Sequence, residues 1–190
     1  MTRLPSVLLP GHLPLAELCA ARLDGELRAL DEGFVLCDLP TGAAERGAAL
    51  LAVLPRGTVA DRSSAAWVHG ATTEPPALHS ASIDREHRLR PQPRARVRFH
   101  EVRLPAADVV SIGGCPVTTP VRTLIDLTRV PDACDDSLLR SLALTTGTAL
   151  EDVLAALEAA GSAVAGRRIA ERRLAAALGA RPPSGPLSPR

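Results

Sequence analysis

Arginine is the residue type that most clearly offers chemistry in this chain. All 22 basic residues are arginine, and lysine is absent. The chain therefore has no amine for a Schiff base, for a phosphate-binding Walker loop or for the lysine of common nuclease sites. Between residues 62 and 103, eight arginines stand against four acidic residues, although the net charge of the whole chain is only +1. Planar guanidinium groups bind phosphates and carboxylates through paired hydrogen bonds, so this segment predicts a surface for an anionic partner.

The arginines are densest in the connection between two predicted strands. We predict that this connection contacts DNA phosphates or an acidic protein face, together with two arginines nearer the N-terminus. The alternative is a solvent-exposed hairpin tip. The candidate residues for binding DNA or a partner are Arg85, Arg88, Arg90, Arg94, Arg96, Arg98, Arg22 and Arg28.

The other reactive residue types form no recognisable catalytic set. The five histidines lack metal-binding spacing, and the four cysteines lack a C-x-x-C pair, which favours buried reduced thiols. Backbone amides of Gly113 and Gly114 could hold an anion, but a plain turn also accounts for them. Asp135 and Asp136 could be the metal ligands of a nuclease, although acidic residues at a helix start commonly interact with the helix dipole. We therefore expect no enzyme activity, no metal and no cofactor.

Membrane and secretion signals are missing from the sequence pattern. Three prolines break the apolar N-terminus, which makes it a poor signal peptide, and no stretch reaches the roughly 20 apolar residues that span a bilayer. We expect a cytoplasmic protein without a membrane partner.

The segment 58–70, TVADRSSAAWVHG, organises the predicted fold. A short strand leads to Asp61 or Ser63 as the cap of a short helix, and Gly70 ends that helix. Trp67 is the only tryptophan, beside two phenylalanines and no tyrosine. A ring of this size usually lies where two layers meet, so we predict that Trp67 belongs to the core.

Hydrophobic periodicity and turn residues predict the remaining elements and an α+β fold class. The expected strands are 34–37, 58–60, 79–83, 97–102 and 108–112. The expected helices are 15–22, 25–32, 43–54, 65–68, 119–130, 132–144, 148–160 and 167–178. Two short helices and then a strand indicate a short, degenerate winged-helix-like segment at the N-terminus, or else a helical pedestal that packs on the next part of the chain.

The predicted organisation has four parts. Residues 1–40 form the winged-helix-like segment, and residues 41–130 form a core with a small mixed or antiparallel sheet and helices. Residues 131–179 form C-terminal helices, and residues 180–190 form a tail whose composition is typical of disorder.

Two motifs resemble those of a known family. The segment 58–70 resembles the S-h-x-S-A-A-x-l-H-G segment of AbiEi-family antitoxins, which belong to type IV toxin–antitoxin systems in actinobacteria. The later run 113–127, GGCPVTTPVRTLIDL, is similar to the family's G-x-P-V-T-x-P-x-R-T-l-x-D-L. The strand pair before it also matches, so the resemblance spans roughly residues 13–130.

The resemblance implies a transcriptional regulator with an N-terminal winged helix for operator DNA and a core that acts opposite a nucleotidyltransferase-like toxin. This chain departs from the pattern, because its N-terminal helices are short and acidic. The alternatives are a protein-interaction module without DNA binding and, more remotely, a metal-dependent nuclease. The sequence does not indicate an oligomeric state. We expect a structural role for the motif residues Ser64, Ala65, Ala66, Trp67, Gly70, Thr118, Pro120, Arg122, Thr123 and Asp126.

Overall fold

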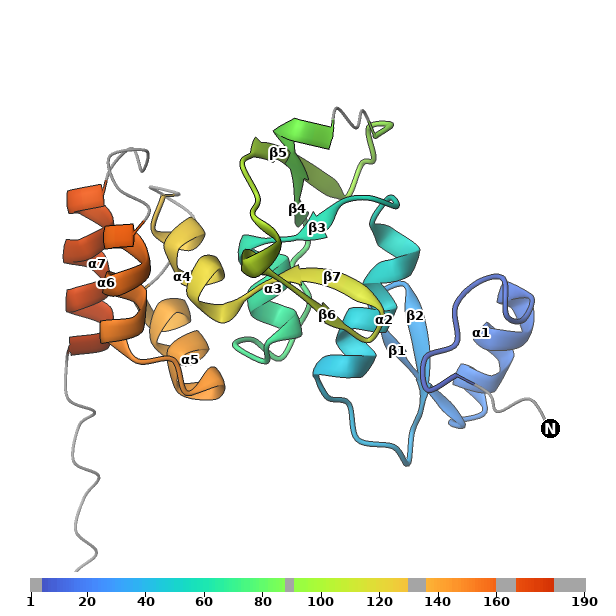
Figure 1. Ribbon diagram of the computed structural model, residues 1–190. Coiled ribbons are helices and arrows are strands. Elements are labelled where there is room, and N and C mark those ends of the chain that lie inside the picture. Colours follow the sequence, from blue (N-terminus) through green and yellow to red (C-terminus); the bar gives the residue numbers. More distant parts are fainter. Residues whose placement is uncertain (1–4, 88–90, 130–135, 160–166, 180–190) are drawn as a thin grey trace, which may run out of the picture.

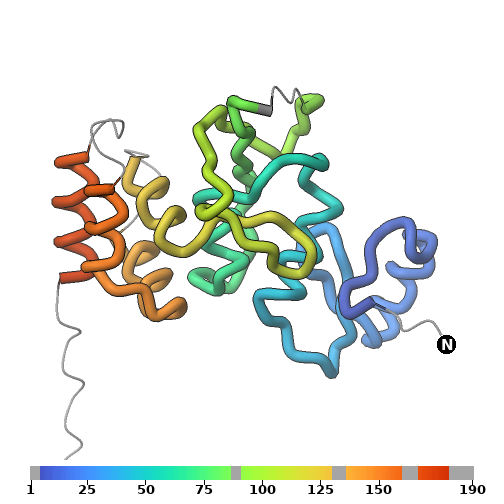
Figure 2. Tube along the Cα trace, in the orientation of Figure 1, coloured from blue at the N-terminus to red at the C-terminus, as the bar shows by residue number. Residues whose placement is uncertain are grey.

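The computed structural model describes residues 5–87, 91–129, 136–159 and 167–179. It confirms the α+β class: seven α-helices and two sheets, of two and five strands, lie within these residues. Figure 1 shows an N-terminal segment, a central sheet with its helices and a helical C-terminal end arranged in a row. Figure 2 shows that the chain runs through them in sequence order. The predicted tail 180–190 lies outside the described residues.

The N-terminal segment contains one helix and a β-hairpin. Helix α1 (Leu15–Leu23) is followed by β1 (Leu27–Leu30) and β2 (Gly33–Leu36), which pair antiparallel. The helix predicted over 25–32 is wrong. Asp31 has a left-handed φ of +54°, so the chain reverses tightly there and Leu27 pairs with Leu36. Aspartate is one of the few residues that tolerates this backbone.

Helix α1 contributes little to the core. Only Leu18 is buried, against the small cluster around Leu8 and Phe34, while Leu15 is 55% exposed. The expectation of buried thiols is wrong for Cys19 and Cys37, which are exposed. Both lie in the N-terminal segment, whose own hydrophobic cluster contains only four buried residues and therefore covers few side chains. Cys115 is buried, and burial raises the pKa of its thiol to about 11; Cys134 lies outside the described residues.

The central sheet has the strand order β5-β4-β3-β7-β6. Its strands are β3 (Val59–Ala60), β4 (His79–Asp84), β5 (Val97–Val102), β6 (Val109–Ile112) and β7 (Cys115–Thr118). Strands β3 and β4 pair antiparallel, as do β6 and β7, whereas β4 pairs parallel with β5 and β3 pairs parallel with β7. The arginine-rich connection after β4, which begins with the short 3₁₀ helix Arg85–His87, is therefore a crossover and no hairpin tip. Two strands that run the same way cannot be joined by a tight turn.

Helices α2 (Ala43–Val53) and α3 (Arg62–Val68) pack against the sheet and bury the predicted anchor. Trp67 is 0% exposed and shares a cluster with Leu50, Ala81 and Val117, so its core position is confirmed. Leu51 of α2 is 47% exposed, although its neighbour Leu50 is fully buried.

The C-terminal end consists of helices packed on one another. Helices α4 (Pro120–Thr128), α5 (Asp136–Thr146), α6 (Leu150–Ala159) and α7 (Arg167–Gly179) share a second core that includes Leu124, Leu142 and Leu174. Ala66 of α3 also belongs to this core, so the helical end is joined to the central sheet through α3.

Two glycines allow α2 to approach the turn between β6 and β7 closely. A Cβ added at Gly47 would lie 2.1 Å from the carbonyl oxygen of Ile112. A Cβ at Gly113, which has a φ of +58°, would lie 1.9 Å from the carbonyl oxygen of Ala44. The glycine turn noted in the sequence is therefore a packing contact between backbones.

Gly47→Ala should destabilise the chain, because the added methyl group meets backbone that cannot move aside cheaply. The expected cost is about 2 kcal/mol, or a loss of about 5 °C in melting temperature by circular dichroism. Helix propensity alone would favour alanine by about 1 kcal/mol. The control is Gly179→Ala at the end of α7, where no described atom outside the helix's own backbone lies within 4 Å of the added Cβ. Equal melting temperatures of the two variants would contradict the close approach.

Candidate binding surface

The two sequence motifs meet in the centre of the molecule. Ala60 of β3 pairs with Val117 of β7. Directly after α3, the Nε2–H of His69 donates to the carbonyl oxygen of Thr118 at 2.8 Å. The hydroxyl groups of Thr118 and Thr123 lie 2.7 Å apart and are both buried. The motifs thus hold the unit of β3 and α3 against the unit of β7 and α4.

The remaining residues of the first motif also make contacts inside the chain. The backbone N–H of Ser80 donates to the Ser64 hydroxyl at 2.9 Å, and His79 Nδ1 lies 3.0 Å from the same oxygen. Ala65 and Ala66 are fully buried. Gly70 follows α3 with a φ of +90°, as expected of a residue that ends a helix.

Arg122 of the second motif is enclosed by two carboxylates. Its Nε donates to Asp126 at 2.7 Å and its Nη1 to Asp108 at 2.8 Å, and the side chain is 11% exposed. Burial raises the pKa of Asp126 above its usual value, although Arg122 and Arg129 act in the opposite direction. Pro120 is the first residue of α4, where its missing N–H costs no hydrogen bond.

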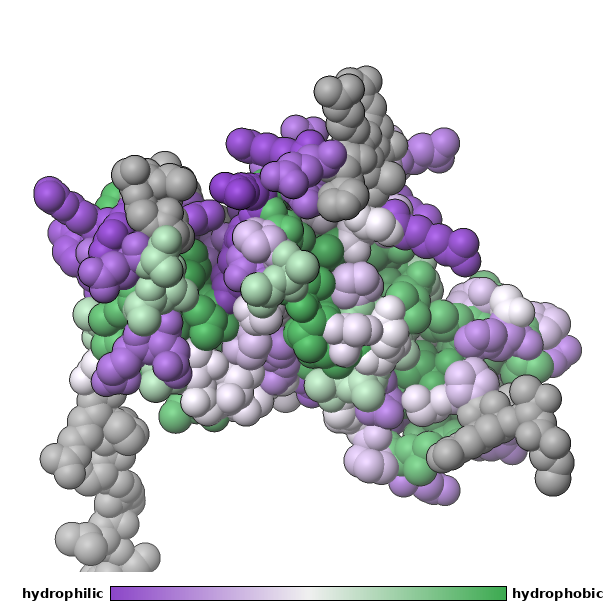
Figure 3. Space-filling view, viewed as in Figure 1, coloured by the Kyte–Doolittle hydropathy of each residue, from purple (hydrophilic) through white to green (hydrophobic). Residues whose placement is uncertain are grey.

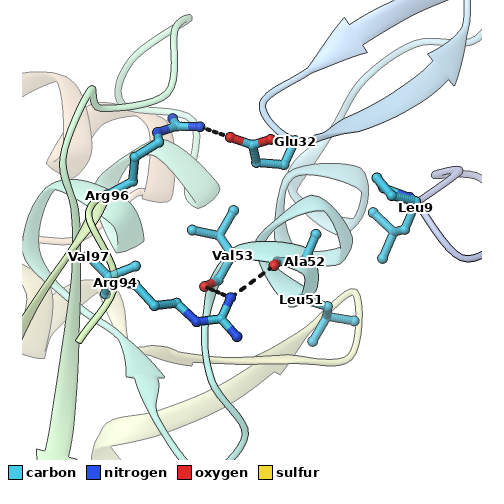
Figure 4. A pocket seen from close by; sticks show the side chains of 9 residues that line it. Leu9, Glu32, Leu51, Ala52, Val53, Arg94, Arg96 and Val97 are labelled. Atoms are coloured by element: carbon cyan, nitrogen blue, oxygen red, sulfur yellow. Dashed lines mark hydrogen bonds and ion pairs between the residues drawn. The ribbon is translucent and has the colours of Figure 1, made fainter. Parts of the chain in front are cut away.

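Arg94 and Arg96, two of the arginines predicted to bind a partner, instead make contacts inside the chain. They line a groove of about 420 Å³ between the N-terminal segment and the core, with Leu9 and Leu51 among its apolar side chains (Figure 4). Arg94 donates to the carbonyl oxygens of Ala52 at 3.4 Å and Val53 at 3.0 Å, at the C-terminal end of α2. Helix ends leave such carbonyls unpaired, so a guanidinium there acts as a cap.

Arg96 fastens the hairpin of the N-terminal segment. It donates to Asp31 at 2.7 Å and pairs with Glu32. Asp31 Oδ2 also lies 2.9 Å from Nε2 of the fully buried His79. Burial by itself raises the pKa of Asp31, but its contacts with His79 and Arg96 outweigh burial and lower that pKa below 3.8. We refer to Asp31, His79 and Arg96 as the hairpin latch.

The other predicted arginines vary in their surroundings. Arg22 is exposed on α1, and Arg28 donates to the carbonyl oxygen of Leu39 at 3.1 Å and to the Thr41 hydroxyl. Arg85 donates to the carbonyl oxygen of Glu101 at 3.2 Å, whereas Arg98 is exposed on β5. Figure 3 shows hydrophilic residues gathered over the region of β5. Arg88 and Arg90 lie outside the described residues.

Sequence reasoning missed a pocket on the polar face of β4 and β5. Ser80 pairs with Arg98, and Ser82 with His100, so these four side chains point to the same face of the sheet. Of these four, Ser80, Arg98 and His100 line a pocket of about 280 Å³. The pocket is completed by His79, by Arg62 and Ser63 of α3, and by the apolar side chains of Leu78 and Leu127. We call it the arginine pocket. The alternation along 97–102 indicated a polar face, but the parallel partner strand was not recognised.

The arginine pocket contains a strained residue. Arg62 has a left-handed φ of +44°, which costs a non-glycine residue about 1 kcal/mol or more. Its buried Nε has no hydrogen-bond partner among the described residues. Its neighbour Asp61 is 1% exposed and accepts a hydrogen bond from Ser82 at 2.7 Å, and its Oδ2 lies 3.2 Å from His100 Nδ1.

Neither a metal-binding cluster nor a membrane-spanning helix is found in the part of the chain that the structure describes. There, no three His, Cys, Asp or Glu side chains gather in a way that could hold a metal ion. Asp136 is exposed at the start of α5, and Asp135 lies outside the described residues. No described helix has the length and apolarity to cross a bilayer.

The fold and its contacts define a small α+β protein with an arginine-bearing polar face. The family model described as the AbiEi antitoxin C-terminal domain matches residues 56–186, and the chain therefore belongs to this family. This confirms the resemblance inferred from the two motifs and supports an antitoxin-like regulatory role. No curated protein matches the sequence.

One similar solved structure is the crystal structure of the RV2827C protein from Mycobacterium tuberculosis. The similarity covers 92% of this chain and 76% of that chain, at 15% sequence identity and a TM-score of 0.34.

Asp31→Asn should destabilise the chain at neutral pH by about 2 kcal/mol, because a neutral amide replaces the charge that pairs with Arg96 and His79. Asparagine tolerates the left-handed backbone at this position, so the change isolates the charge. Because the pKa of Asp31 is lowered in the fold, its contribution is complete above pH 3.8 and is lost as the pH falls through the lowered value.

Urea unfolding at pH 7 and at pH 3 checks this expectation. The difference in unfolding free energy between the unaltered chain and Asp31→Asn should shrink at the lower pH. Asp38→Asn, on an exposed carboxylate outside the hairpin latch, is the control and should have no such effect. A difference that is the same at both pH values would contradict the role of the charge.

Proposed function

We propose that this chain is an antitoxin-like transcriptional regulator that works by binding and catalyses no reaction. In this proposal its main binding surface is the polar face of β4 and β5, and operator DNA is the first partner. Membership of the AbiEi antitoxin family supports the regulatory role. The geometry supports the choice of surface, since Arg98 on this face and Arg85 just after β4 have no ion-pair partner among the described residues.

The proposal rests on which guanidinium groups already bind acceptors inside the chain and which remain free to bind a partner. Arg94, Arg96 and Arg122 are occupied by carbonyl or carboxylate groups of the chain itself. Arg98 is exposed and has no ion-pair partner among the described residues, and Arg85 uses only its Nε on a carbonyl group. Arg98 lies on β5 opposite Ser80, and Arg85 lies in the 3₁₀ helix just after β4, so the two guanidinium groups could contact separate phosphates along one DNA backbone.

The N-terminal segment is a weaker candidate for reading DNA. A recognition helix normally brings several basic side chains to phosphates and base edges. Here α1 offers Arg22, the hairpin's Arg28 already contacts Thr41, and the acidic hairpin turn is bound to the core by the hairpin latch. We therefore place the predicted partner contacts chiefly on Arg85 and Arg98.

A double substitution of Arg85 and Arg98 by Ala should weaken binding to the DNA upstream of the gene and flatten its salt dependence. Each phosphate contact contributes a slope of about −0.9 in log K against log salt, so the slope should fall by about 2. Mobility-shift titrations between roughly 50 and 200 mM salt measure it. The matched control replaces the exposed Arg168 and Arg172 of α7 by Ala, which removes the same charge elsewhere. The absence of any shift at low salt would exclude DNA as the partner.

A protein-interaction module is the second candidate, and the docked, acidic N-terminal segment is the observation that favours it. The partner would then be a nucleotidyltransferase-like toxin with an acidic contact face. Co-expression with such a protein from the neighbouring reading frame should give a stable complex by size-exclusion chromatography. Substitution of Arg85 and Arg98 should reduce complex formation, whereas the α7 control should not. Complex formation without a DNA shift would favour this candidate.

A further inference from the structure

The arginine pocket has an excess of positive charge that nothing in its lining neutralises. Among the described residues, its polar lining consists of Arg62, Arg98, His79, His100, Ser63 and Ser80, without a carboxylate. Neither Arg62 nor Arg98 has an ion-pair partner in the described part of the chain, in contrast to Arg96 and Arg122. The pocket is therefore suited to an anion that accepts several hydrogen bonds.

His100 is held in position from behind. Its Nδ1 faces the buried carboxylate of Asp61, which the Ser82 hydroxyl also holds. The imidazole is 17% exposed, and its Nε2 has no partner among the described residues. A histidine bound through one nitrogen by a buried carboxylate presents the other nitrogen in a fixed direction.

Arg62 provides a second, independent indication of a ligand. Its backbone is strained, and its buried Nε lacks a hydrogen-bond acceptor among the described residues although it lines the same pocket. Strained residues persist where the surrounding structure requires their position, and such residues cluster at ligand sites. An anion bound in the pocket would face the guanidinium group of Arg62, which has no ion-pair partner among the described residues.

The apolar lining narrows the class of anion. Leu78, which is 40% exposed, and Leu127 line the pocket together with the arginines. A single tetrahedral oxyanion would fill only part of its volume of about 280 Å³. Pockets of this kind commonly combine an apolar wall with a few polar groups that fix the orientation of an organic ligand.

We propose that the arginine pocket binds a phosphate monoester. The phosphate group lies against Arg62, Arg98 and His100, and the organic group lies against Leu78 and Leu127. Ser63 and Ser80 offer hydroxyl groups between these two ends. This site goes beyond the proposed function, because it concerns a small ligand and does not depend on binding to operator DNA or to a toxin.

Isothermal titration of the full chain with three probes tests the proposal. The probes are adenosine 5′-monophosphate, inorganic phosphate and adenosine. The mononucleotide should bind most tightly, phosphate should bind more weakly, and adenosine should bind at least tenfold more weakly than the mononucleotide because it lacks the charged group. Equal affinity for adenosine and the mononucleotide, or no binding of either phosphate-containing probe, would overturn the proposal.

Two variants assign the binding to the arginine pocket. Arg98→Met should weaken binding of the mononucleotide about tenfold or more through loss of a charged donor. Arg62→Asn should weaken it similarly, while its melting temperature stays equal to or above that of the unaltered chain because asparagine tolerates the left-handed backbone.

Arg85→Ala, which removes a charge outside the pocket lining, is the matched control and should leave mononucleotide binding unchanged. If Arg85→Ala weakens DNA binding and leaves mononucleotide binding unchanged, the DNA surface and the arginine pocket are distinct sites. Mononucleotide affinity that is unchanged in both Arg98→Met and Arg62→Asn would place the binding elsewhere and overturn the assignment.

Discussion

The parallel pairing of β3 with β7 is the contact on which the rest of this structure depends. It joins Ala60 to Val117, and β3 has only two residues, so side chains must reinforce the junction. His69 does so from the end of α3 by donating to Thr118. Because α3 and α4 come directly after these strands, the same junction brings Ala66 and Leu124 into one core and connects the helical C-terminal end to the sheet.

Arginine has two different physical roles in this chain, which has no lysine to share them. Arg94, Arg96 and Arg122 use their planar, multiple donors to bind a helix end, a hairpin turn and two carboxylates. Arg62 and Arg98 have the same chemistry but no anionic partner in the described chain. The residue type is therefore a poor guide to function here, and the number of donors already used inside the fold is a better one.

The hairpin latch explains why the N-terminal segment behaves as part of the core. Val7, Leu30 and Val35 belong to the same hydrophobic cluster as Trp67, whereas α1 buries only Leu18. A small apolar contact is thus supplemented by the charged contacts of Asp31 with His79 and Arg96. This arrangement fixes an acidic hairpin turn beside the sheet and occupies Arg96, whereas Arg98 on the neighbouring strand β5 stays exposed.

The sequence by itself determined the α+β class, most helices, the buried position of Trp67 and the family, because periodicity, caps and short motifs are local properties. It did not determine that residues 27–30 form a strand, since that depends on a tight reversal at Asp31 and on pairing with Gly33–Leu36. Nor did it determine that β4 and β5 run parallel, and so it suggested a hairpin tip where a crossover lies. Which arginines remain available, and that Arg62 meets Arg98 and His100, depend on contacts between residues far apart in sequence. Only the tertiary structure decides such contacts, because a charge in the sequence does not reveal its partner.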